Sequence, residues 1–308
     1  MNLRTVAAAA VCTLAVLAAT SGAATAAEAK PADSRAELYR RNLLANRDAP
    51  CRTNASCAAL GVAALETGRI KDAQTLVAME AALADATAMQ AAEENSPKAT
   101  RSARARVTMA LVHQGDVQLK LGALPDARAY YRTAIDQGQR FPNDALLGRA
   151  VTAARERLEA IAGKNVVAGL PDKGARFGRY MFFGSWNTVS LKPVKGRRGV
   201  YRLDGDFLYP SVDPGGQLGA NTGNLLAYVR FYDGIARVPV TGSGEAPLDA
   251  TAKITRLAPY DKRDDKCLIE FRLAAPETLD VLTRGSPTEC GFGSNVSADG
   301  RYYLMTGS

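Results

Sequence analysis

The feature that most constrains the fold of this chain is a short internal repeat. The same spacing occurs first in Gly61, Leu65, Gly68, Ile70, Asp72 and Ala73 and again in Gly115, Leu119, Gly122, Leu124, Asp126 and Ala127. In both copies a helical pattern ends at a glycine, which suits the positive φ of a tight turn, and a second helical pattern follows. Stacked helical hairpins produce such repetition, and they build binding surfaces rather than reaction centres.

Further helix signals extend this pattern over the first half of the chain. Ser34 with Glu37 three residues later predicts the capped start of a short helix. Five more helices are predicted over residues 55–67, 70–94, 100–121, 125–137 and 145–162. Pro125 fits the first turn of its helix, where a missing N–H is harmless. The first half is therefore expected to be all-α, as a helical repeat or as a plain helical bundle.

The two copies resemble the tetratricopeptide repeat. In its frame of about 34 residues, the copy at 108–141 has Leu111, Gly115, Ala127, Tyr131 and Ala134 at the usual positions, and the copy at 54–87 has Gly61, Gly68, Ala73 and Val77. Three departures weaken the match. Glu80 stands where the family prefers alanine, Gln114 stands where it prefers leucine, and the copies are 54 residues apart.

The resemblance implies a non-enzymatic scaffold protein that binds a protein partner through its inner helices. On that basis the partner-binding residues are predicted to be His113, Gln114, Asp116 and Tyr130. Each of them is also compatible with an ordinary helix surface. A plain bundle with the same turn chemistry is the alternative for the fold.

Composition changes sharply near residue 165. Of the 20 aromatic residues, 4 lie before Asn165 and 16 after it, and glycine is divided 8 to 19. Beyond this point the hydrophobic period becomes two, as in Cys267, Ile269, Phe271 and Leu273. We therefore expect an α + β protein of two domains, with a helical domain at 28–165 and an antiparallel β barrel or sandwich at 166–308.

Several connections in the second domain have turn signals. Hairpin turns are predicted at Asp204-Gly205, Asp233-Gly234 and Asp299-Gly300. Residues 215–223 are glycine-rich and lack the Gly-Lys-Ser/Thr of a phosphate-binding loop, so they are interpreted as a hairpin connection or binding loop. The mixed charges of residues 261–266 lack calcium-loop spacing and are interpreted as a solvated loop.

The closing segment, residues 290–302, is similar to that of small β domains in exported bacterial proteins, among them some lysozyme inhibitors. This resemblance gives the alternative function, a β domain that binds or inhibits an envelope hydrolase such as lysozyme. A basic chain would repel lysozymes, which are usually basic themselves.

The N-terminal segment has the pattern of a secretory signal peptide. Residues 1–27 contain Arg4, an apolar run at 6–19 and small residues before a cleavage site near residue 27. The mature chain is expected to be periplasmic or secreted and not membrane-spanning. It keeps four cysteines, for which the simplest of three disulfide connectivities pairs Cys51 with Cys57 and Cys267 with Cys290.

The remaining sequence has no catalytic, metal or cofactor signature. His113 is the only histidine, and no GxSxG motif accompanies it. After the signal peptide, Lys/Arg exceed Asp/Glu by 20 to 16 up to Lys164 and by 18 to 15 beyond it. By count neither half is strongly basic, so no nucleic-acid partner is expected. A paired-carboxylate cell-wall hydrolase is the least favoured hypothesis.

Overall fold

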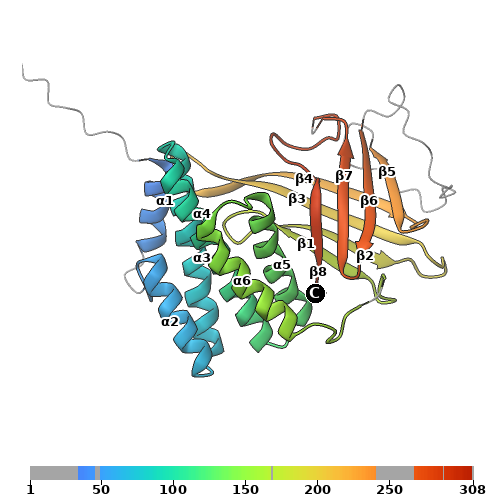
Figure 1. Cartoon of the computed structure of the whole chain (residues 1–308). Coiled ribbons are helices and arrows are strands. Elements are labelled where there is room, and N and C mark those ends of the chain that lie inside the picture. The colour runs from blue at the N-terminus through green and yellow to red at the C-terminus, as the bar shows by residue number, and fades with distance from the viewer. Residues whose placement is uncertain (1–33, 46–48, 168, 241–266, 287, 307–308) are drawn as a thin grey trace, which may run out of the picture. The chain divides into compact units, whose positions relative to one another are not determined.

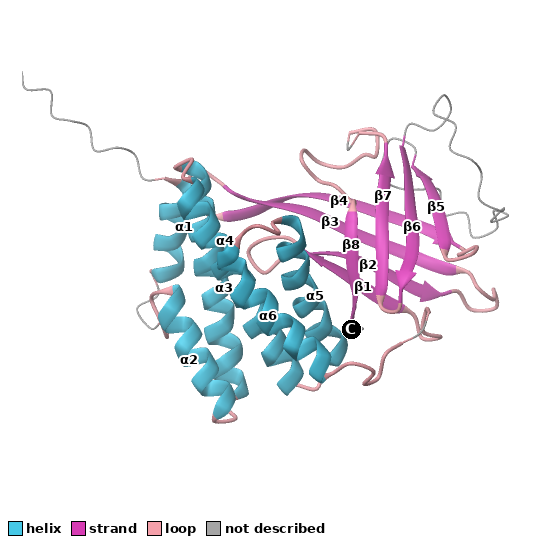
Figure 2. Ribbon diagram, in the orientation of Figure 1, coloured by secondary structure: helices cyan, strands magenta, loops and turns pink. Residues whose placement is uncertain are grey.

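The computed structural model describes residues 34–45, 49–167, 169–240, 267–286 and 288–306. All of them lie in one compact unit, Asp33–Ser308, within which a helical domain packs against a β domain. The predicted signal peptide and the mixed-charge loop at 261–266 lie outside the described residues. Helices come first in the chain and an antiparallel sheet follows, so the predicted α + β fold of two domains is confirmed (Figures 1 and 2).

Six helices form the first part of the described chain, close to the predicted ranges. They are α1 (Arg35–Leu44), α2 (Asn54–Glu66), α3 (Ile70–Glu93), α4 (Pro97–Lys120), α5 (Leu124–Arg140) and α6 (Ala145–Ala160). The predicted cap at Ser34 is present at the start of α1. The Ser34 hydroxyl accepts a hydrogen bond from the backbone N–H of Glu37 at 3.2 Å. Among these helices none is both long and apolar enough to cross a membrane.

The repeated glycines explain how each helical hairpin closes. A Cβ on Gly61 would lie 2.9 Å from a methyl carbon of Val77, and a Cβ on Gly115 would lie 2.4 Å from the ring of Tyr131. The missing side chain lets α2 approach α3 closely at Gly61 in the first copy, and it lets α4 approach α5 closely at Gly115, the equivalent position of the second copy. The Cys51–Cys57 disulfide, as predicted, closes the loop before α2, and both cysteines are buried.

The second part of the chain is a nearly closed antiparallel barrel, which decides between the predicted barrel and sandwich. Its strands are β1 (Ala175–Tyr180), β2 (Trp186–Pro193), β3 (Tyr201–Val212), β4 (Leu218–Val229), β5 (Ile235–Val240), β6 (Cys267–Ala275), β7 (Thr278–Arg284) and β8 (Gly300–Met305). They pair in the order β4-β3-β2-β1-β8-β7-β6-β5. Every pair of chain neighbours except β4 and β5 is therefore hydrogen-bonded, the first and last strands pair, and β4 and β5 form the two edges of the sheet. The predicted domain boundary at 165/166 falls between α6 and β1 and stays a prediction.

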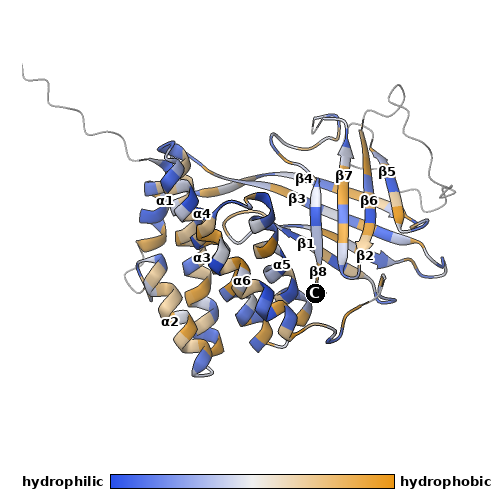
Figure 3. Ribbon diagram, viewed as in Figure 1, coloured by the Kyte–Doolittle hydropathy of each residue, from blue (hydrophilic) through white to orange (hydrophobic). Residues whose placement is uncertain are grey.

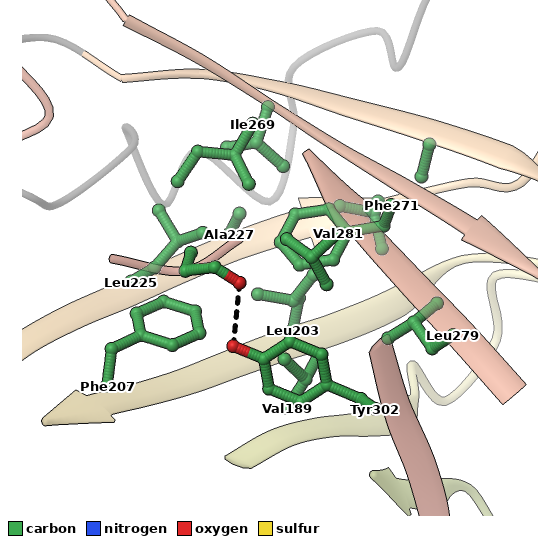
Figure 4. Packing of buried hydrophobic residues seen from close by; sticks show 14 of the residues in the cluster. Val189, Leu203, Phe207, Leu225, Ala227, Ile269, Phe271, Leu279, Val281 and Tyr302 are labelled. Carbon is green, nitrogen blue, oxygen red and sulfur yellow. Dashed lines mark hydrogen bonds between the residues drawn. The ribbon is translucent and has the colours of Figure 1, made fainter. Parts of the chain in front are cut away.

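The barrel is filled by the inward-facing residues of its strands (Figure 4). Along β7, Leu279 and Val281 are buried, whereas Asp280 is partly exposed and Leu282 is exposed. Hydrophobic and hydrophilic residues are interspersed along the strands of the barrel (Figure 3). Among the described residues of the barrel, the fully buried aromatic side chains are Phe177, Phe207, Phe271 and Tyr302. Because a buried hydroxyl needs a partner, Tyr302 donates to the carbonyl of Ala298 at 2.7 Å. The predicted Cys267–Cys290 disulfide is present and lies in this core.

Two of the three predicted hairpin turns are wrong. Asp233-Gly234 does turn the chain between β4 and β5, with both residues at positive φ. Gly205 instead lies inside β3, where a Cβ would come 2.7 Å from the ring of Phe207. Gly300 is the first residue of β8 and pairs with Val281 of β7, so Asp299-Gly300 ends a long β7–β8 connection and does not form a tight turn. The predicted glycine-rich connection is confirmed only up to residue 217, because β4 starts at Leu218.

The long β3–β4 hairpin extends from the barrel to the first helix (Figure 1). The side-chain amide of Asn42 in α1 donates to the carbonyl oxygen of Gly216 at 2.9 Å. Val212, at the end of β3, is buried in one cluster with Tyr39 of α1 and Ala86 of α3. Helices and barrel are thus connected at a place far from their junction in sequence.

Candidate functional site

Residues of the helical domain line a groove. Its volume is about 330 Å³, and its residues come from α2, α4 and α6, with one from α3 at the base. On α4 they recur at three- and four-residue intervals, which places them on one face of that helix. The lining residues are Asn54, Ala58, Glu80, Ser102, Ala105, Arg106, Met109, His113, Leu146, Arg149 and Ala150.

At the base of the groove His113 meets a buried carboxylate. Its Nδ1 lies 2.8 and 3.0 Å from the two oxygens of Glu80, whose side chain is 2% exposed. Nδ1 faces both carboxyl oxygens of Glu80, so it is assigned as the donor, and Nε2 remains for another contact. The side-chain amide of Asn54 in turn donates to the backbone oxygen of Glu80 at 3.0 Å. The imidazole is therefore held in a fixed orientation.

The groove also has two exposed arginines, Arg106 on α4 and Arg149 on α6. No carboxylate in the described ranges forms an ion pair with either of them. By contrast, Arg104 on the neighbouring face of α4 pairs with Asp144 at 3.3 Å and lies 3.4 Å above the ring of Phe141. Groove arginines are thus available to a ligand, and a guanidinium matches carboxylate geometry.

Asp116, predicted to contact a partner, is already bonded within the chain. One oxygen of its carboxylate accepts the Tyr131 hydroxyl at 2.8 Å and the Arg157 Nε at 2.5 Å. Burial, followed by the nearby Asp116 charge, raises the pKa of Tyr131. This network connects α4 to α5 and α6, beside the groove residues.

The other two predicted contact residues differ in exposure. Tyr130 is 8% exposed, and its ring meets the ring of Trp186 edge-on at 5.0 Å. Gln114 is half-buried on α4 and is not among the groove-lining residues. Of the four predicted residues, the structure places only His113 in the groove, while Tyr130 packs against the barrel. Whether a partner touches any of the four stays a prediction.

A hydrolytic reading of the groove has little geometric support. Ser102 and His113 lie on the same helix, eleven residues apart, which corresponds to about 16 Å along the axis. A nucleophile and its base need hydrogen-bond distance. Within the described ranges, no group of three or more Asp, Glu, His or Cys side chains is arranged to hold a metal ion.

A second cavity, of about 560 Å³, lies where α5 and α6 meet the β6–β7 turn and β8. Its charged side chains are all used within the chain. Arg132 pairs with Glu277 at 3.3 Å, Asp136 accepts the Tyr303 hydroxyl at 2.5 Å, and Arg301 pairs with Asp280. The charged side chains of this cavity are therefore less available to a ligand than the groove arginines.

Two buried carboxylates fasten the helices to the barrel. Glu277, in the β6–β7 turn, accepts the Arg128 Nε at 2.7 Å, and both side chains are almost fully buried. Asp85 of α3 accepts the backbone N–H of Phe183 at 2.7 Å and the Tyr180 hydroxyl at 3.2 Å. Burial raises the pKa of Asp85 to about 7, although both hydrogen bonds act in the opposite direction.

Comparisons with models of protein families, with curated proteins and with solved structures found no match to this chain. The groove itself is therefore the basis for a functional assignment. Sequence reasoning missed Arg106 and Arg149, although their positions on predicted inner helices could have identified them.

Proposed function

We propose that this protein is a non-enzymatic, exported binding protein whose helical groove takes an acidic segment of a partner protein. The observation that carries the proposal is the pair of arginines, Arg106 and Arg149, which line one groove from neighbouring helices without a carboxylate partner among the described residues. Charge-assisted hydrogen bonds from guanidinium to carboxylate are among the stronger polar contacts available to proteins.

The rest of the groove supports a peptide ligand. Leu146 is 48% exposed at the groove, and Met109 and Ala105 add apolar surface beside the arginines. The fixed imidazole of His113 supplies one further polar contact. An acidic peptide with an apolar side chain would satisfy both kinds of group. The tetratricopeptide-like arrangement of the inner helices agrees with this use, since such repeats bind segments of other proteins.

Export agrees with the two disulfides, because such bonds persist in oxidising compartments. The predicted signal peptide makes the periplasm or the cell exterior the proposed location. A partner would then be a protein of the cell envelope.

The test is peptide binding by fluorescence anisotropy, using labelled hexaglutamate, hexaserine and hexalysine with the chain that begins at Asp33. We expect only hexaglutamate to bind. The double variant Arg106→Gln/Arg149→Gln should weaken that binding at least tenfold, because each charged hydrogen bond contributes about 1.5–3 kcal/mol.

The matched control, Lys71→Gln/Arg155→Gln, removes the same charge from exposed positions outside the groove lining. It should change the affinity less than about twofold. Equal losses in both double variants would show that net charge alone attracts the peptide, and would reject the groove as its site.

A further inference from the structure

The β2–β3 connection concentrates positive charge at one end of the barrel. Residues 192–202, which we call the basic hairpin, contain five Lys or Arg and no Asp or Glu. The five are Lys192, Lys195, Arg197, Arg198 and Arg202. They include the last residues of β2 and the first of β3, at the opposite end of β3 from its contact with α1 (Figure 1). The even balance of charge between the two halves conceals this cluster.

Four of the five positive charges of the basic hairpin are open to solvent. Lys192, Lys195, Arg198 and Arg202 are exposed, and no ion pair is formed by these four in the part of the chain that the structure describes. Lys192 lies directly opposite Arg202 in the β2–β3 register. Like charges opposite each other destabilise a strand pair. Folding alone gives no reason for this arrangement, whereas a negatively charged partner does.

Arg230, which follows β4, adds an independent observation. Its Nη2 donates to the backbone oxygen of Arg198 at 3.2 Å, which holds the guanidinium against the hairpin. Its Nε is buried and finds no acceptor among the described residues. A buried donor without an acceptor is costly, so the fold holds this positive charge beside the hairpin without fully satisfying it.

A cavity of about 470 Å³ opens at the same turn. Arg197 and Arg198 line it together with Tyr201, and the carboxylate of Asp172 lines one edge. Apart from that carboxylate, the charged lining is cationic. A phosphate group has the charge and the acceptor oxygens that this setting lacks.

We propose that the basic hairpin docks on an anionic phospholipid surface, with lipid phosphates contacting the exposed cations of the hairpin. Adsorption to such a surface requires clustered Lys and Arg near one another, which the hairpin supplies. Single-stranded nucleic acid would also require aromatic rings free for base stacking. Tyr201 is half-buried and its ring packs edge-on against Phe231 at 6.3 Å, so a lipid surface fits better.

The experiment is vesicle co-sedimentation with the chain that begins at Asp33. This start removes the apolar N-terminal run, which would itself bind lipid. It keeps every described helix and strand within the compact unit. Vesicles of phosphatidylcholine are compared with vesicles containing about 30% phosphatidylglycerol at low salt, where surface charge is least screened.

We expect binding to the anionic vesicles only, and loss of binding as salt is raised. Lys195→Gln/Arg198→Gln should lower the partition coefficient about 25-fold, because each basic residue near the surface contributes about fivefold. The matched control Lys71→Gln/Lys98→Gln removes two exposed charges from the helices and should retain binding. The groove variant Arg106→Gln/Arg149→Gln should also retain it, which separates this site from the peptide groove.

Four results would overturn the proposal. The first is equal sedimentation with neutral vesicles, and the second is equal loss in the hairpin variant and its control. The third is release from the vesicles by inorganic phosphate at constant ionic strength, which would assign the site to free phosphate. Tighter binding of a single-stranded oligonucleotide than of anionic vesicles at the same salt would assign it to nucleic acid, and would equally overturn the lipid proposal.

Discussion

One carboxyl group, that of Asp85, should contribute strongly to the pH dependence of the free energy of unfolding. It is 2% exposed between α3 and the β1–β2 connection, and one of its oxygens has no partner among the described residues. Its pKa is 3.8 in an unfolded chain and about 7 in the fold. Ionising it therefore costs about 4 kcal/mol more in the native state than in the unfolded state.

The direction of the effect follows from which state binds the proton more tightly. Below pH 3.8 Asp85 is protonated in both states and has no effect. As the pH rises further, the unfolded chain ionises first, so the free energy of unfolding falls until the native group also ionises near pH 7. Asp85→Asn stays neutral throughout, and its amide oxygen can still accept the Phe183 N–H. Relative to this variant, the wild type should lose about 4 kcal/mol between pH 4 and pH 8.

The assay is urea denaturation at several pH values, followed by fluorescence. Trp186 is the only tryptophan of the chain, and its ring meets that of Tyr180, which is bonded to Asp85. Other buried carboxyls, such as Asp136, titrate equally in both proteins and cancel in the difference. Asp72→Asn, on the surface of the same helix, should keep the wild-type profile within about 1 kcal/mol. Parallel profiles for wild type and Asp85→Asn would refute the reasoning.

Three further predictions concern packing, charge and disulfides. Gly115→Ala should lower the free energy of unfolding by about 1–3 kcal/mol, because the added Cβ clashes with the ring of Tyr131. Gly148→Ala should raise it by about 0.5–1 kcal/mol, because the added Cβ meets nothing within 4 Å. Thermal denaturation that ranks the two variants the other way would contradict this. Glu277→Gln should cost about 3–5 kcal/mol in urea denaturation, because it leaves buried arginine charge without its counter-ion, and a loss below about 1 kcal/mol would show that the pair is dispensable. Cys267→Ser/Cys290→Ser should lower the free energy of unfolding by about 3 kcal/mol, and loss of the Cys51–Cys57 disulfide should lower it by about 2 kcal/mol, because the first disulfide spans 23 residues and the second spans 6. Calorimetry that finds the reverse order would reject the loop-entropy argument.

The helical half could be predicted from sequence because its signals are local. Caps, turn glycines and the first-turn prolines act within a few residues of each helix end, so the sequence contains them directly. The strand half depends on distant partners. Gly205 and Gly223 suggested turns or loops, yet each lies in a strand beneath an aromatic ring, Phe207 in one case and Phe292 in the other. Such a ring is invisible until the strands are paired.

The candidate groove shows the same division between local and distant information. Glu80 was a departure from the repeat pattern, and His113 was a lone histidine on the next helix pair. The structure brings them together at the base of the groove. Their meeting depends on how α3 packs on α4, which no spacing within one helix reveals. The basic hairpin, by contrast, was contiguous in sequence and was hidden only by counting charge over whole halves.

The contact between α1 and the tip of the β3–β4 hairpin has a consequence for the order of folding during synthesis. Asn42 and Gly216 are 174 positions apart. α1 also packs on α3, which is synthesised soon after it. The ribosome must nevertheless complete β3 before Val212 can cover Tyr39 and Gly216 can accept the Asn42 amide. Chaperones or proteases that act before that point should therefore meet α1 with one side still uncovered.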